Sequence, residues 1–187
     1  MKKPKKEEKP LSGAQDAYEW LQILIVALVT IILVFTFVGR ITPVVGESML
    51  PTLHEGDVML IRDIGYTDPH PGDIVVLTKE FDAARGPIVK RIIAVEGQTV
   101  DIDYQTGTVY VDGEALDEPY LNEPMEEPWY EDLTSVTVPE GSVFVMGDNR
   151  NHSNDSRDVT LGTVDTRYLL GKAEFICFPF SDFGRIG

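Results

Sequence analysis

The apolar positions divide the chain into one long run and a series of short ones. From Trp20 to Val38 there are 19 residues without a charged side chain, and Arg40 follows soon after. A helix of this length spans about 28 Å, close to the hydrocarbon thickness of a bilayer. We therefore expect residues 20–39 to form a transmembrane signal anchor, with Trp20 at the interface between lipid and water.

This apolar run has two alternatives to a membrane anchor. A cleaved secretory signal also follows a basic segment, but its apolar core is shorter and a small-x-small cleavage motif comes after it. Residues 35–40 offer no such motif. A buried core helix is the second alternative, although an uncharged run of this length is typical of a membrane span. A retained anchor is the prediction.

After Arg40 the apolar runs shorten to the length of β-strands. Turn residues precede several of them, and their Val and Ile content is typical of strands. Asp112-Gly113 directly after Val109–Val111 predicts a tight hairpin. The expected strands cover 58–61, 74–77, 87–95, 109–111, 134–138 and 143–146. The predicted fold is mostly β, with an N-terminal transmembrane helix followed by a β-rich domain of antiparallel sheets over residues 40–187.

One stretch between these strands has no clear periodicity. Glu114–Asp132 carries eight carboxylates together with Pro119, Pro124 and Pro128. Proline and unpaired charge of one sign disfavour regular structure. This stretch is predicted to be a long acidic surface loop.

Charge is unevenly distributed and indicates an orientation. Residues 1–10 carry a net charge of +3, whereas residues 40–187 hold 11 Lys and Arg against 27 Asp and Glu, a net of −16. Lysine-rich tails stay in the cytoplasm. We therefore expect a cytoplasmic tail (1–19), a single pass through the cell membrane, and an extracytoplasmic domain (40–187). A domain this acidic is not expected to bind nucleic acid, whose phosphates require basic contacts. Anionic lipid would repel it, so the domain needs the anchor to remain at a membrane.

A candidate nucleophile lies shortly after the apolar run, in Gly46-Glu47-Ser48-Met49-Leu50-Pro51-Thr52-Leu53. The eight residues from Arg40 to Ser48 extend at most roughly 27 Å, so Ser48 is expected to act close to the membrane surface. A serine hydroxyl needs a neighbouring base. A histidine triad is disfavoured because the glycine after the serine that marks the hydrolase turn is missing. The three histidines, His54, His70 and His152, lie in polar stretches typical of the surface.

Lys90 is the second candidate base. Residues 87–95 are apolar except for Lys90 and Arg91. Residues two apart in a strand share a face, which places Lys90 between Ile88 and Ile92. Burial there would lower the lysine pKa, whereas an ordinary lysine is almost wholly charged at pH 7. A lysine that protects an edge strand from aggregation is the alternative, and this strand alone favours neither.

The third polar block is Gly147–Arg157, which is rich in Asp, Asn, Ser and Arg. A solvated turn is the simplest interpretation. A calcium loop is excluded because Arg150 occupies a ligand position and no late glutamate closes the loop. The sequence has no Cys/His cluster for a metal, and no metal or other cofactor is predicted. Alternating Asp and Arg suit ion pairs that fix a loop, with Ser153 directed inward.

Together these blocks resemble the bacterial type I signal peptidases. That family has a Ser-Met-x-Pro-Thr-Leu box, a Gly-Asp-Ile-Val-Val box, a Lys-Arg box and a Gly-Asp-Asn-Arg…Ser-x-Asp-Ser-Arg box. They are matched in order and spacing by residues 48–53, 72–76, 90–91 and 147–157. The resemblance covers residues 20–187. The short stretch between the last two boxes resembles the compact members with one anchor.

The resemblance implies a membrane-anchored serine endopeptidase that removes signal peptides from exported preproteins after small-x-small motifs. Ser48 would be the nucleophile and Lys90 the general base. Ser153 would orient Lys90, and the ion pairs Asp148–Arg91 and Asp155–Arg157 would hold the site. The Ser48 N–H would stabilise the oxyanion. Relatives with a second donor carry a hydroxyl where this chain has Gly46, so a backbone group at or near Gly46 is the expected substitute.

Signal peptides and the lipid bilayer are the partners that the resemblance implies. A signal peptide would bind in extended form by adding β pairing. The predicted apolar pocket walls are Val44, Met49, Leu53, Ile74, Val76 and Val89. Two other classes stay open: an anchored β domain with an inactive site that serves as a scaffold, and a Ser-Lys protease related to the self-cleaving repressors. Those repressors carry DNA-binding domains rather than membrane anchors.

Overall fold

The computed structural model describes residues 13–37, 39–63, 65–83, 86–126 and 132–186. The chain forms two compact units, Met1–Val38 and Gly39–Gly187. The second unit is called the β domain below. Most of the predicted cytoplasmic tail lies outside the described residues.

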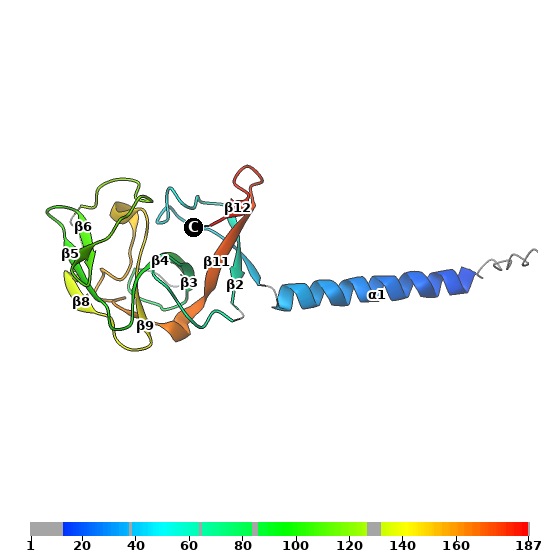
Figure 1. The fold of residues 1–187 in the computed structure, drawn as a ribbon. Coiled ribbons are helices and arrows are strands. Elements are labelled where there is room, and N and C mark those ends of the chain that lie inside the picture. Colours follow the sequence, from blue (N-terminus) through cyan, green and yellow to red (C-terminus); the bar gives the residue numbers. More distant parts are fainter. Residues whose placement is uncertain (1–12, 38, 64, 84–85, 127–131, 187) are drawn as a thin grey trace, which may run out of the picture. The chain divides into compact units, whose positions relative to one another are not determined.

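The described residues of the first unit form one helix, α1 (Gly13–Phe37), of 25 residues (Figure 1). Within it, Gly13–Leu33 is long and apolar enough to cross a membrane. The apolar side chains up to Leu33 are exposed on all sides of the helix, and a helix that is apolar on every face needs an apolar surrounding. The helix begins seven residues before the predicted start at Trp20. It is consistent with a membrane anchor.

An eight-stranded antiparallel sheet forms the larger part of the β domain (Figure 1). Its strand order is β1-β2-β11-β3-β4-β9-β10, and β12 pairs with β11 beside this path. The strands are β1 (Arg40–Pro43), β2 (Val58–Arg62), β3 (Ile74–Leu77), β4 (Ile88–Val95), β9 (Ser142–Met146), β10 (Val164–Asp165), β11 (Leu169–Phe178) and β12 (Gly184–Arg185).

A second antiparallel sheet has four strands in the order β7-β6-β5-β8. They are β5 (Thr99–Asp103), β6 (Thr108–Val111), β7 (Glu114–Ala115) and β8 (Ser135–Thr137). The predicted hairpin joins β6 to β7, and Asp112 and Gly113 both have positive φ angles, 53° and 82°. Such angles suit Asp and Gly at the two central turn positions.

The larger sheet buries apolar side chains on both faces. All four residues of β3 are buried, and they divide between two clusters. Ile74 and Val76 pack with Met49 and Leu53, whereas Val75 and Leu77 pack with residues of β9 and β10. Successive strand residues face opposite sides, so a continuous apolar run is what a doubly covered strand requires. This arrangement places β3 in the interior of the β domain, with apolar side chains covering both of its faces.

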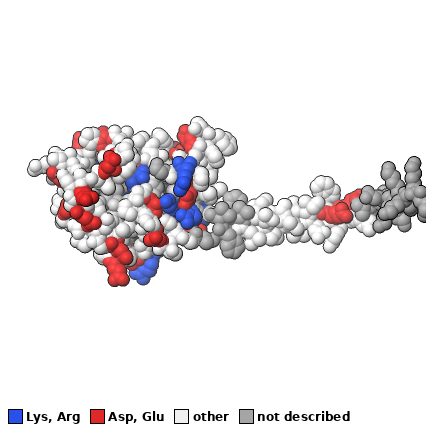
Figure 2. All heavy atoms as spheres, viewed as in Figure 1, with Lys and Arg blue, Asp and Glu red and all other residues white. Residues whose placement is uncertain are grey.

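The predicted fold class is confirmed: one N-terminal apolar helix followed by two antiparallel sheets. All six predicted strands are present to within about two residues at each end. The interpretation of Lys90 as a lysine that protects an edge strand is wrong, because its side chain is buried and not on the surface. Acidic side chains are spread over the face shown in Figure 2, where basic ones are few.

The acidic stretch 114–132 is not wholly a surface loop. It contains β7, and Met125 is buried in the core under the second sheet. The Glu118 side chain is only 5% exposed because it pairs with Arg150. Residues 127–131 of the stretch lie outside the described residues. The prediction failed because aperiodic sequence indicates a lack of regular structure, not a lack of burial.

Candidate active site

Ser48 and Lys90 lie side by side although 42 residues separate them. Lys90 Nζ is 2.7 Å from Ser48 Oγ and also donates to the backbone oxygen of Val89 at 2.9 Å. Lys90 enters from β4, and Ser48 from the turn that follows β1. The separation is a hydrogen-bond distance, so a proton can pass directly between the two groups.

The Lys90 ammonium is held in an environment that disfavours its charge. The residue is 3% exposed. Burial lowers the pKa of Lys90 from 10.5 to about 8, while the Asp155 carboxylate opposes this and the Arg157 guanidinium adds to it. A lysine with this pKa is uncharged in an appreciable fraction of molecules near neutral pH. Lys90 therefore has the chemistry of a base.

A buried ion pair organises the loop opposite Lys90. Asp155 accepts from Arg157 Nε at 2.8 Å and from Ser153 Oγ at 2.7 Å, and its Oδ2 also accepts the N–H of Gly147 at 3.0 Å. Burial alone would raise the pKa of Asp155, but Arg157 and these hydrogen bonds hold it below its usual range. Asp155 is thus a fixed negative charge that orients Ser153.

A second buried ion pair joins this loop to β4. Arg91 donates Nε and Nη2 to the two oxygens of Asp148, at 2.8 and 2.7 Å. A third guanidinium nitrogen donates to the Gly72 oxygen at 3.0 Å, and Thr52 Oγ1 donates to Asp148 Oδ2. Two parallel bonds fix both position and angle. Asp148 thereby connects the Ser48 segment, β4 and the Gly147 loop.

Gly147 lies where these segments approach most closely. A Cβ atom at this position would collide with Ser153 Oγ and with the backbone oxygen of Ser48. The latter is a main-chain atom, so it cannot move aside as a side chain could. Only glycine allows the loop to pack directly against the Ser48 segment.

The sequence did not identify Asn149 as a site residue. Its backbone N–H donates to the oxygen of Ser48 at 3.0 Å, and its Nδ2 donates to the oxygen of Glu47 at 3.1 Å. Asn149 belongs to the polar block Gly147–Arg157, but its contacts are with the backbone of a segment that is distant in the sequence. No pattern in the sequence marks such contacts.

Two residues of the acidic stretch also support the site. Glu118 forms an ion pair with Arg150, whose Nε donates to the Gly147 oxygen at 3.1 Å. Tyr120 covers the Arg91 guanidinium, with the charged carbon 4.0 Å from the ring centroid. Neither residue gave a sequence signal, because both lie in a segment without periodicity. Together they hold the two arginines against the Gly147 loop.

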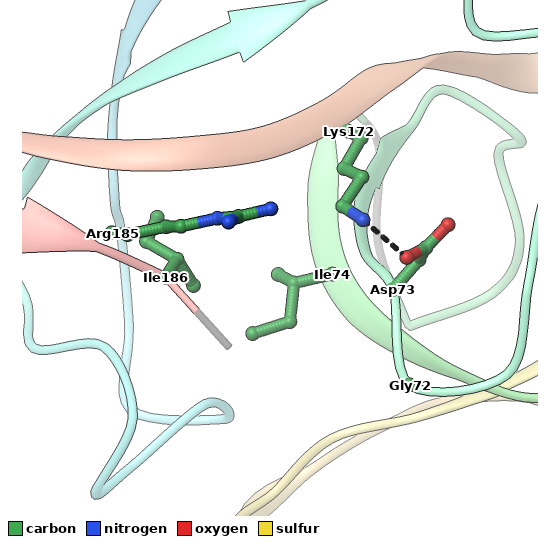
Figure 3. A pocket seen from close by; sticks show the side chains of 6 residues that line it. All are labelled: Gly72, Asp73, Ile74, Lys172, Arg185 and Ile186. Carbon is green, nitrogen blue, oxygen red and sulfur yellow. Dashed lines mark hydrogen bonds and ion pairs between the residues drawn. The ribbon is translucent and has the colours of Figure 1, made fainter.

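A cavity of about 90 Å³ opens beside Ser48 and Lys90. Four of the six predicted wall residues line it, namely Val44, Met49, Val76 and Val89. Leu53 and Ile74 do not line it: Leu53 is wholly buried in the core, and Ile74 lies opposite Arg91 in the sheet, whereas Val76 lies opposite the cavity residue Val89. Ile74 instead lines a separate cavity of about 410 Å³ with Arg185 and the Lys172–Asp73 ion pair (Figure 3).

Gly46, the expected position of a second oxyanion donor, has a φ angle of +86°. A residue with a side chain is strained in this region, which favours glycine. A hydroxyl at position 46 would therefore require a different backbone. The conformation explains why this chain carries glycine there.

The histidine alternative finds no support in the geometry. His54, His70 and His152 are all exposed, and the group that contacts Ser48 Oγ is Lys90. Among the described residues, no group of three or more His, Cys, Asp or Glu side chains could hold a metal ion.

Comparison with known proteins gives consistent matches. Residues 17–178 match the family described as signal peptidase, peptidase S26. The chain is 40% identical over 178 residues to the probable signal peptidase I-1 of Synechocystis, which covers 90% of this chain and 86% of that protein. It is 36% identical over 184 residues to signal peptidase I of Bacillus licheniformis, covering 94% and 96%. The chain also matches the crystal structure of a signal peptidase I from Enterococcus faecalis, with 32% sequence identity and a TM-score of 0.46. The match covers 57% of this chain and 97% of the Enterococcus faecalis chain.

Proposed function

The chain belongs to the signal peptidase family, peptidase S26, and from this membership we propose that Ser48 and Lys90 are its catalytic dyad. It is a signal peptidase I, a serine peptidase that cleaves signal peptides from secreted preproteins. The observation that carries the proposal is the 2.7 Å contact between the buried Lys90 Nζ and Ser48 Oγ.

In the proposed reaction, neutral Lys90 takes the hydroxyl proton while Ser48 Oγ attacks the scissile carbonyl carbon. The carbonyl oxygen becomes an oxyanion and accepts a hydrogen bond from the Ser48 N–H. Lys90 then gives its proton to the leaving amine, the C–N bond breaks, and an acyl-enzyme remains. Lys90 then takes a proton from a water molecule that attacks the ester carbon, the bond between the acyl carbon and Ser48 Oγ breaks, and Lys90 returns the proton to Ser48 Oγ. Asp155 is proposed to support these steps by accepting the hydrogen bond of Ser153 Oγ, and the family resemblance implies that Ser153 in turn orients Lys90.

The substrate segment is proposed to bind along the free part of β4. Pairing between β4 and β9 begins at Arg91, so Ile88 and Val89 have no β9 partner. Both residues line the cavity beside Ser48. An extended peptide could add to this edge and place small side chains in the cavity. The volume of about 90 Å³ suits small residues at the first and third positions before the cut.

The protein is also proposed to cross the cell membrane once, with the lysine-rich tail in the cytoplasm and the β domain outside. The charge distribution and the exposed apolar helix α1 support this orientation. The chain would then act where a signal peptide leaves its cleavage site, a few residues outside the same bilayer.

Membrane vesicles test the reaction and the orientation together. Right-side-out vesicles that carry the protein should cut a preprotein added outside, and the new N-terminus should follow a small-x-small motif. Sealed inside-out vesicles should cut it only after detergent is added. Cleavage by sealed inside-out vesicles would overturn the orientation, and cleavage at unrelated motifs would overturn the substrate assignment.

The pH dependence of cleavage should follow the loss of the proton from Lys90. Because its pKa is lowered to about 8, kcat/KM should rise about tenfold per pH unit below pH 8 and level off above it. At pH 6 the rate should be about 100-fold below the plateau. The test is to measure initial rates of cleavage from pH 5.5 to 9.5 and to check at each pH that the protein remains folded. An inflection near 6.5 would point to a histidine instead.

Val89→Ala should relax substrate selection. The half-buried Val89 lines the cavity, and removing its two methyl groups leaves room for a larger substrate side chain. Two substrates are compared, one with alanine and one with valine at the first or third position before the cut. The ratio of kcat/KM for the valine substrate to kcat/KM for the alanine substrate should rise roughly tenfold in Val89→Ala. Val159→Ala, at an exposed position, is the control. Unchanged selection would remove Val89 from the pocket.

A further inference from the structure

Asn149 is bound to both peptide groups that flank the Ser48 Cα atom. The carbonyl of the peptide before Ser48 belongs to Glu47, and it accepts Asn149 Nδ2 at 3.1 Å and the Leu50 N–H at 3.1 Å. The carbonyl of the following peptide is that of Ser48 itself, and it accepts the Asn149 N–H at 3.0 Å. Asn149 is 2% exposed.

The first of these bonds fixes a group on the opposite side of the peptide. A peptide unit is planar and trans, so its C=O and N–H point in opposite directions. Holding the Glu47 oxygen therefore sets the direction of the Ser48 N–H. A hydrogen bond to the carbonyl also polarises the peptide and makes its N–H a better donor. We infer that Asn149 is a positioning residue that aims and strengthens the Ser48 N–H at the developing oxyanion; this rests on the proposed function.

Two observations argue against a purely structural role for the amide. Asn149 precedes the 3₁₀ helix η1 (Arg150–His152), yet its side chain does not cap it. Asparagine at such a position ordinarily caps the following helix. In addition, the buried Asn149 Oδ1 has no hydrogen-bond partner among the described residues. An unpaired buried oxygen destabilises by at least as much as one typical hydrogen bond stabilises. The amide thus adds little to folding.

The inference also separates Asn149 from the base. The hydrogen bonds of Lys90 Nζ go to Ser48 Oγ and the Val89 oxygen, and the charges that act on Lys90 are those of Asp155, Arg157 and Asp148. Replacing Asn149 should therefore slow the chemical step without moving the pH at which Lys90 loses its proton.

Asn149→Leu is the principal test because leucine has nearly the shape of asparagine but no donor and no unpaired oxygen. In the full chain in detergent micelles, kcat should fall by about 10- to 100-fold while KM changes little. Affinity for a peptide aldehyde, which forms a tetrahedral adduct on Ser48, should fall in parallel with kcat/KM. The apparent pKa of the rate profile and the melting temperature should stay at their wild-type values. Asn149→Ala should behave in the same way, and His152→Ala, exposed in the same loop, should remain fully active.

The results that would overturn the inference are distinct from those that would overturn the dyad. Wild-type kcat in Asn149→Leu refutes it, provided that Ser48→Ala and Lys90→Met are inactive. A fall in kcat accompanied by a shifted rate-profile pKa, or by a lower melting temperature in both variants, would show a general distortion of the loop and also refute it. If Ser48→Ala or Lys90→Met stays active, the dyad itself fails.

Discussion

Replacing Ser48 with alanine or Lys90 with methionine is expected to lower kcat/KM for preprotein cleavage by at least about 10⁴-fold. Ser48→Ala removes the attacking oxygen, and Lys90→Met removes the base 2.7 Å from it while nearly keeping the shape of the side chain. Because the two groups act as one unit, the double variant should be about as slow as either single variant.

The assay for these variants follows release of the mature N-terminus from a purified preprotein by the full chain in detergent. The matched control replaces all three exposed histidines, His54, His70 and His152, with glutamine, and it should retain activity. Methionine is neutral and apolar at a site that disfavours charge, so Lys90→Met should remain folded. Activity in Lys90→Met would refute the dyad, and loss of activity in the histidine variant would revive the triad.

Asp155→Ala should cause the largest loss of stability among the site variants. It leaves Arg157, which is 1% exposed, without its carboxylate partner, and it removes the acceptor for Ser153 Oγ and the Gly147 N–H. Breaking a buried pair by removing one partner destabilises by roughly 3–5 kcal/mol. Thermal unfolding of the full chain, followed by near-ultraviolet circular dichroism, should show a lower melting temperature. Cleavage should be lost as well, because Ser153 is no longer held.

The chain provides a matched control for this experiment. Asp165 and Arg167 have the same spacing, and Asp165 likewise accepts from the N–H, Nε and Nη2 of its arginine. That pair is at the surface, with Arg167 85% exposed, so water replaces the lost contact. Asp165→Ala should melt close to wild type. Equal losses in the two variants would show that burial does not determine the strength of the Asp155 pair.

The strands that could be predicted from the sequence are those with short apolar runs after turn residues. β11 was missed although it is the longest strand, because Lys172 and Glu174 interrupt its apolar pattern and two register shifts against β2 interrupt its alternation. A bulge changes which side chains face the core, so the period of two is lost. The isolated sequence contains no sign of where such a bulge lies.

The residues of the candidate site also fall into those that could be predicted from the sequence and those that could not. Ser48, Lys90 and the two Asp–Arg pairs could be proposed because a local pattern or the family resemblance marks them. Glu118 and Tyr120 could not, since their effect depends on long-range contacts with Arg150 and Arg91. Asn149 was overlooked for a related reason: its partners are backbone oxygens, which every residue possesses.

Protonation of the buried Lys90 side chain destabilises the folded state of this protein. Below about pH 8 the folded chain must keep a charged ammonium out of water, whereas the unfolded chain holds the same proton up to about 10.5. Between these two values the unfolded state binds more protons at this position, so stability rises with pH. The difference between the two pKa values, 10.5 and about 8, corresponds to about 3 kcal/mol in the stability of the folded chain. Alkaline conditions that free the base for catalysis therefore also remove a buried charge that destabilises the fold.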